Sequence, residues 1–174
     1  MPTIPPIFGS TFSDVAALIY KIYPHRIQKG NRFQYNAENN LLKDFAAAKR
    51  KMLITCHTFT CHWHPDIDPR WFNNAVNSHK DDGVTIVIAS EVDPPEFIQK
   101  FVDSGAIHFR KTDHLPFVSH LVDDKIIDIS VDARDGGLSP GGFYWRTEYA
   151  MPDILEFLKD LLISTTSHDL KQLI

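Results

Sequence analysis

Short apolar runs alternate with amphipathic segments between residues 52 and 110, and this alternation limits the possible folds more than any other feature. Residues 52–55, 84–89 and 106–110 have the length and apolar character of buried strands. The two segments between these runs carry apolar residues at helical spacing, and each begins near an Asp-Pro pair. Strand, helix, strand, helix, strand with short connections predicts right-handed crossovers and a parallel sheet that is covered on both faces.

A different arrangement is predicted for the second half of the chain. Residues 117–122 and 126–131 are strand-like runs on either side of Asp123-Asp124-Lys125, which predicts an antiparallel hairpin with a tight polar turn. The aromatic residues 143–145 form either a short edge strand or a lid. Apolar residues at helical spacing over 151–163 predict a closing helix.

These elements predict one α/β domain over residues 36–163, with a mostly parallel sheet, a C-terminal antiparallel hairpin and helices on both faces. Its first helix is expected to begin near residue 36 and to feed the first strand at about residue 51. We expect a lead-in and a helix over residues 1–35 before the domain, and a polar tail over residues 164–174 after it.

The composition is that of an ordinary soluble globular protein, with 174 residues that are 43% hydrophobic and 23% charged. A net charge of -4 argues against general nucleic-acid binding. No apolar run reaches the ~18–20 residues that span a bilayer, and the N-terminus lacks the features of a signal peptide. The two cysteines, Cys56 and Cys61, do not indicate a secreted disulfide scaffold, although a strained loop disulfide between them stays open. We therefore expect a cytoplasmic protein with reduced thiols.

The order of elements resembles one half of the phospholipase D-like fold, over about residues 38–163. The family begins with a helix that ends in an Ala-rich, Lys-containing stretch and feeds a strand, as residues 46–51 do here. Asp82-Gly83-Val84 resembles the start of its second strand, and Val122-Asp123-Asp124-Lys125 resembles its hairpin turn. Active members bring two such halves together, so the resemblance implies a homodimer or a companion protein chain.

The catalytic signature of the family is missing from this sequence. That signature is His-x-Lys, four further residues, then Asp, in which the His attacks phosphorus and the Lys stabilises the developing oxyanion. Counting back from Asp123 gives Pro116 and Val118, and counting back from Asp124 gives Phe117 and Ser119. The resemblance thus implies a degenerate domain.

The segment from Lys111 to Phe117 is similar to members that bind without hydrolysing, including effector-sensing domains of archaeal sugar-responsive regulators. We therefore predict a non-catalytic binding or regulatory module for a small anionic ligand or a protein partner.

Ligands of open α/β sheets bind at the carboxyl ends of the strands, where residues 56–65, 90–93 and 111–115 are expected to converge. Cationic side chains at such an edge suit a phosphate or a carboxylate. Other interpretations remain open, because Arg110 could instead pair with Asp113, and His120 could be a satisfied sheet histidine. The predicted ligand contacts are Arg110, Asp113, His114 and His120.

The loop from Cys56 to Asp68 is dense in soft and borderline metal ligands. Zinc or another transition metal is possible there, although the spacing matches no standard zinc motif. The second function hypothesis is therefore a metal-dependent hydrolase or phosphodiesterase that uses this loop, and the other interpretation is a polar loop without metal. The candidate metal ligands are His57, Cys61, His62 and His64.

Overall fold

The computed structural model describes residues 41–57, 59, 69–113, 115, 117–131, 143–148, 150, 152–165, 170, 171 and 173, so the predicted lead-in and helix over 1–35 lie outside it. Residues 41–47 are helical. The elements that follow are β1 (Lys51–Cys56), α3 (Pro69–Asp81), β2 (Thr85–Ser90), α4 (Glu96–Asp103), β3 (His108–Lys111), β4 (Val118–Val122), β5 (Ile126–Val131), β6 (Phe143–Thr147) and α5 (Pro152–Thr165). None of the described helices is long and apolar enough to cross a membrane.

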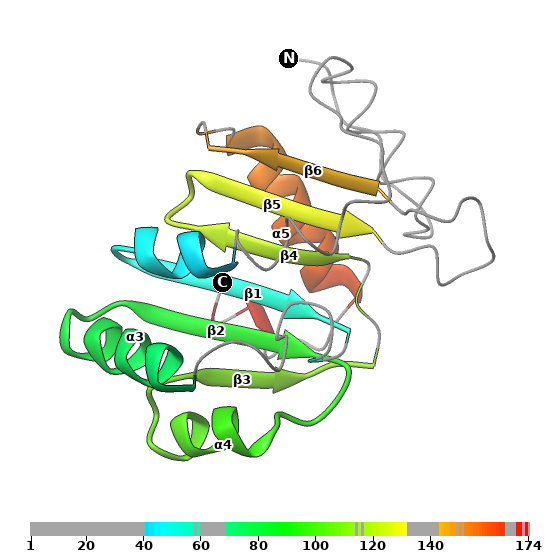
Figure 1. The fold of residues 1–174 in the computed structure, drawn as a ribbon. Coiled ribbons are helices and arrows are strands. Elements are labelled where there is room, and N and C mark those ends of the chain that lie inside the picture. Colours follow the sequence, from blue (N-terminus) through cyan, green and yellow to red (C-terminus); the bar gives the residue numbers. More distant parts are fainter. Residues whose placement is uncertain are drawn as a thin grey trace.

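The strands form one six-stranded sheet in the order β3-β2-β1-β4-β5-β6 (Figure 1). β1, β2 and β3 pair in parallel, as the alternation of strands and helices predicts. β4 pairs antiparallel with both β1 and β5, and β6 pairs antiparallel with β5. Four of the six strands therefore point in the same direction, and β4 and β6 oppose them. The α/β fold with a mostly parallel sheet and a C-terminal hairpin is confirmed, and residues 143–147 are an edge strand.

Two hydrophobic cores lie on opposite faces of this sheet, because side chains alternate along each strand. On one face, which we call the α3 face, Met52 and Ile54 of β1 pack with residues of the 41–47 helix, α3 and α4. On the other, the α5 face, Leu53 packs with the apolar side of α5. The prediction of helices on both faces is confirmed, and Figure 1 shows α5 behind the sheet.

Two local predictions need correction. The sequence Asp93-Pro94-Pro95-Glu96 suggests an acidic helix cap, but Pro95 is the N-cap of α4 and no side chain caps it. Asp93 instead forms an exposed ion pair with Lys111, 3.0 Å from its Nζ. The predicted polar tail from residue 164 begins inside α5, and its Leu170 is fully buried in the core of the α5 face.

The β4–β5 turn contains two aspartates, Asp123 and Asp124, and the first of them has a structural use. Asp123 and Asp124 have φ values of 53° and 58°, in the left-handed region that aspartate tolerates better than most residues. The Asp123 carboxylate accepts hydrogen bonds from the backbone N–H groups of Lys49, Arg50 and Lys51 at 2.7–2.8 Å. It thereby fixes the connection between the 41–47 helix and β1.

Candidate functional site

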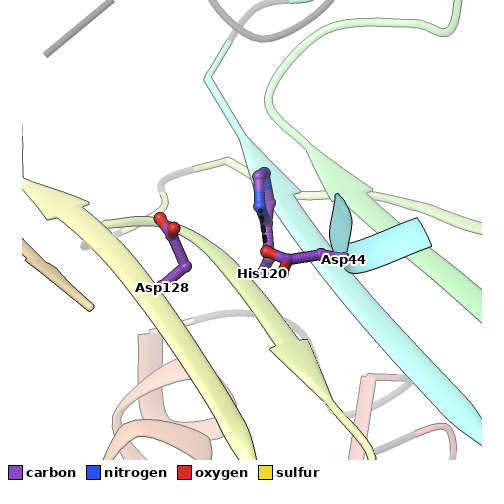
Figure 2. A group of neighbouring side chains, drawn as sticks. All are labelled: Asp44, His120 and Asp128. Atoms are coloured by element: carbon purple, nitrogen blue, oxygen red, sulfur yellow. Dashed lines mark hydrogen bonds and ion pairs between the residues drawn. The ribbon is translucent and has the colours of Figure 1, made fainter. Parts of the chain in front are cut away.

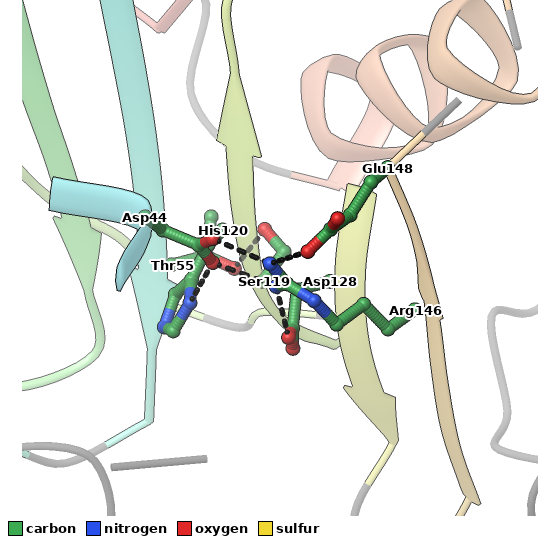
Figure 3. Close-up of polar contacts among 7 residues, drawn as sticks. All are labelled: Asp44, Thr55, Ser119, His120, Asp128, Arg146 and Glu148. Carbon is green, nitrogen blue, oxygen red and sulfur yellow. Dashed lines mark hydrogen bonds and ion pairs between the residues drawn. The ribbon is translucent and has the colours of Figure 1, made fainter. Parts of the chain in front are cut away.

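A cluster of charged residues interrupts the apolar core on the α3 face, beneath the 41–47 helix (Figure 3). The strand register places His120 of β4, Asp128 of β5 and Arg146 of β6 in one row across the sheet. Asp44, on the 41–47 helix, points toward His120 and the guanidinium of Arg146 and is 0% exposed. Glu148 follows β6 at the exposed rim. We call these residues the ionic cluster: Asp44, His120, Asp128, Arg146 and Glu148.

Arg146 connects the three acids of the ionic cluster. Its Nη1 and Nη2 donate to the two carboxylate oxygens of Asp44, at 3.0 and 2.8 Å. Nη1 also donates to Asp128 at 2.8 Å, and Nη2 donates to Glu148 at 3.0 Å. Because a bidentate arginine–carboxylate pair is among the strong polar contacts in proteins, this geometry fastens the helix to β5 and β6.

The surroundings of Asp44 and Arg146 favour their ionised forms. Burial opposes ionisation of Asp44, but hydrogen bonds from His120 and Arg146 outweigh it and hold the pKa of this carboxyl below its ordinary value. Burial disfavours the charged form of Arg146 as well, yet Asp44 and Asp128 raise its pKa. An ionised carboxylate can only accept, so Nδ1 of His120 donates to Oδ2 of Asp44, 3.0 Å away.

Three members of the cluster have the spacing of a metal site (Figure 2). Ligand atoms of Asp44, His120 and Asp128 all lie within 4.8 Å of one another. Arg146 already supplies the cation, however, because the same Nη1 lies within 3.0 Å of an oxygen of each aspartate. A divalent cation would have to displace this guanidinium, so we interpret the cluster as an internal clamp.

Ser119 and His120 do not form a nucleophile–base pair, although they are adjacent in sequence and drawn together in Figure 3. Neighbouring residues of a strand point to opposite faces of the sheet, so Ser119 lies on the α5 face. There its hydroxyl lies 2.8 Å from the hydroxyl of Thr55, which also bonds to the carbonyl of Phe117 at 3.0 Å. The geometry excludes a triad of Ser119, His120 and Asp44.

A second polar group gathers at the carboxyl ends of the parallel strands, where the sequence predicts a ligand site. His57 follows β1 and Glu91 follows β2, and Nδ1 of His57 lies 2.9 Å from Oε1 of Glu91. The same oxygen accepts the backbone N–H of Leu115 at 2.8 Å. Glu91 thus joins the ends of β1 and β2 to the connection between β3 and β4, and both side chains of the pair are mostly buried.

Two buried polar atoms at the end of β3 have no hydrogen-bond partner among the described residues: Nε of Arg110 and the hydroxyl of Thr112. Thr112 extends the pairing of β3 by one residue, through its N–H to the carbonyl of Ser90. Alternation therefore places Thr112 on the same face as Arg110, beside Ala89 of the α5 face. Leaving a buried polar atom unsatisfied costs about 1–3 kcal/mol, so these atoms call for an explanation.

The structure places the predicted ligand contacts Arg110 and His120 on opposite faces of the sheet. Arg110 lies at the expected edge of the sheet, and Asp113 is exposed and does not pair with it. His120 is separated from both, because it belongs to the ionic cluster on the opposite face. His114 and the candidate metal ligands Cys61, His62 and His64 lie outside the described residues, whereas His57 contacts Glu91. Sequence reasoning missed Asp44, Asp128 and Thr112.

No protein-family model matches the sequence, and no curated protein matches it. Solved structures do match. TrmBL2, an archaeal chromatin protein whose structure shows a novel mode of DNA binding, has a TM-score of 0.56 at 10% identity. The match covers 87% of this chain and 57% of that one, so this chain spans just over half the length of the chromatin protein.

Two further matches are bacterial. NucT from Helicobacter pylori has a TM-score of 0.52 at 14% identity and covers 80% of this chain and 95% of its own. Nuc from Salmonella typhimurium, a phospholipase D family member, has a TM-score of 0.48 at 17% identity and covers 74% of this chain and 88% of its own. At such low identities the likeness shows the fold alone, an α/β domain of the kind found in TrmBL2 and NucT.

Two carboxylates, Asp44 and Asp123, should make the stability of the fold depend on pH. Burial disfavours the charged form of Asp123, but hydrogen bonds from the backbone of Lys51, Lys49 and Arg50 outweigh it and lower its pKa, as the pKa of Asp44 is lowered. A lowered pKa contributes stability above the ordinary value of 3.8, and this stability is lost as the pH falls through the folded value. Urea unfolding should therefore show falling stability below about pH 4, with a smaller loss in Asp123→Asn. Equal losses in both proteins would contradict this assignment.

Proposed function

We propose that this chain is a phospholipase D-like domain that binds a small anionic ligand without hydrolysing phosphodiesters. The proposal depends chiefly on Val118, which stands where the resembling family carries its lysine and is 6% exposed in the core. An apolar side chain at that position offers no positive charge to a developing oxyanion. A binding or regulatory role needs no such charge.

The polar residues around this position support the proposal, because their side chains form hydrogen bonds and ion pairs within the protein. Asp123 binds three backbone N–H groups and Asp128 is paired with Arg146. His120, two residues beyond Val118 on the same face, donates to Asp44. The carboxyl ends of β1 to β3 remain the place for a ligand, since open α/β sheets bind there.

DNA is the competing ligand, because TrmBL2 is described as a DNA-binding chromatin protein. A net charge of -4 does not favour phosphate-backbone binding, which depends on many Lys and Arg contacts. We therefore propose a small anion as the ligand. Salt-sensitive binding of duplex DNA in a mobility-shift experiment would overturn this choice.

The metal-dependent hydrolase is the second candidate function, and the His57–Glu91 pair favours it. Metal-binding histidines commonly donate their second ring nitrogen to a carboxylate, which is the contact that Nδ1 of His57 makes here. The carboxylate would orient the imidazole, and Nε2 would be the ligand atom.

Hydrolysis of bis(4-nitrophenyl) phosphate, followed by absorbance of the released 4-nitrophenolate, separates the two candidates. We expect the purified chain to release no more product than buffer, with added zinc and with chelator. Activity that requires zinc and is lost in His57→Ala would support the second candidate. Activity that survives the chelator would contradict both, since it would need a nucleophile independent of metal.

A further inference from the structure

The guanidinium of Arg110 makes a single hydrogen bond with the described residues. Its Nη1 donates to the carbonyl of Phe109 at 2.8 Å. Nε and Nη2 have no acceptor among the described residues, and Nε is fully buried. Nε–H and one N–H of Nη2 point in the same direction from one edge of the planar group, which is the arrangement that holds two oxygens of a carboxylate or phosphoryl group.

Thr112 adds a third donor on the same face. The side chain is 5% exposed, and its hydroxyl has no partner among the described residues. It is two residues beyond Arg110, at the end of the same strand, so alternation directs both side chains to the α5 face. Lys111, between them, points to the other face and pairs with Asp93.

The neighbouring acids leave this pair of residues available. Glu91, opposite Thr112, directs one carboxylate oxygen to His57 and Leu115. Asp113 is exposed and does not pair with Arg110. Among the described residues, the guanidinium therefore has no carboxylate partner of the kind that a mostly buried arginine ordinarily has.

We propose that Arg110 and Thr112 form an anion-binding subsite that holds two oxygens of a carboxylate or phosphoryl group on a small ligand. Nε–H and Nη2–H of Arg110 donate to one oxygen each, and the Thr112 hydroxyl donates to one of these oxygens. The subsite lies at the carboxyl end of β3 on the α5 face. It rests on the proposed binding function and names the ligand group that this function recognises.

An NMR titration of the full chain with inorganic phosphate, and separately with acetate, tests the subsite. We expect saturable shifts of the amide signals of residues 110–112 with at least one anion, and the stronger response identifies the group. Arg110→Gln should weaken binding by about tenfold or more, because a bidentate charged contact is lost. Arg110→Lys should also weaken it, since an ammonium retains the charge without the planar fork.

The matched control is Lys111→Gln, which removes a neighbouring charge from the opposite face and should leave the affinity within about twofold. Thr112→Val should weaken binding by roughly threefold to tenfold while the free protein melts at the same temperature or higher, because an unsatisfied buried hydroxyl is removed. A purely structural threonine would instead lower the melting temperature.

Two results would overturn the subsite. One is a wild-type chain that shows no saturable shift with either anion, and the other is unchanged affinity in both Arg110 variants. Neither result depends on hydrolysis, so the subsite can fail while the chain remains inactive toward phosphodiesters. Conversely, hydrolysis of a diester would refute the proposed function and leave the measured anion affinity in place.

Discussion

Arg146→Ala is expected to lower the free energy of unfolding by about 3–5 kcal/mol, because it leaves two buried carboxylates without their cation. Asp44 is fully buried and Asp128 is 3% exposed, so both carboxylates depend on hydrogen bonds within the protein. Each aspartate receives a hydrogen bond of 2.8 Å from this guanidinium. Urea denaturation followed by circular dichroism measures the loss at neutral pH.

Glu148→Gln is the matched control, because Glu148 bonds to the same arginine but its side chain is 66% exposed. Exposed ion pairs contribute about 0–1 kcal/mol, so this variant should unfold close to the wild type. Losses of similar size in the two variants would show that burial does not set the energy of the cluster, and the clamp interpretation would then be wrong.

Asp123→Ala is expected to destabilise the fold by about 2–3 kcal/mol, the second largest effect. The carboxylate serves three consecutive backbone N–H groups, of Lys49, Arg50 and Lys51, and alanine would leave all of them without this acceptor. Since these groups lie where the helix meets β1, hydrogen exchange at residues 49–51 should also accelerate.

Asp124→Asn is the control for Asp123. The Asp124 side chain is 60% exposed and pairs with Lys159 at 2.7 Å, so its change should cost less than about 0.5–1 kcal/mol. A destabilising effect in Asp124→Asn equal to that of Asp123→Ala would contradict the assignment of the loss to the three hydrogen bonds of Asp123.

The sequence was sufficient to predict the half of the fold in which strands and helices alternate, because each of these elements has a distinct pattern of apolar residues. The apolar runs became β1, β2 and β3, and the amphipathic segments became α3 and α4. The antiparallel placement of β4 between β1 and β5 carries no such local signal, since β4 could in principle pair with either edge of the sheet. The hairpin was predictable from its turn residues, and the sheet order was not.

The ionic cluster could not be assembled from sequence because its members are far apart in the chain, with Asp44 and Arg146 separated by 102 positions. A weaker signal was present. Asp128 stands at an inward position of an apolar strand and Asp44 stands beside the buried Phe45, where a charge requires a partner. Such residues predict that a counter-charge exists without identifying it.

For the proposed strand-end site, the sequence predicts the place but only part of the composition. The rule that open sheets bind ligands at the carboxyl ends of their strands indicates the end of β3 and hence Arg110. Thr112 was overlooked, because an unsatisfied hydroxyl is recognised only from its burial and surroundings. Sequence proximity places His120 in the same site, but its strand directs it to the other face of the sheet.

The 31P NMR spectrum of bis(4-nitrophenyl) phosphate, recorded over hours with increasing amounts of the purified chain, tests most directly whether the domain binds without hydrolysing. A phosphodiester offers the two unesterified oxygens that the proposed site would accept. We expect the diester resonance to shift or broaden with protein concentration while no monoester resonance grows. A monoester resonance that grows in proportion to the protein, or a diester resonance that does not respond, would contradict this expectation.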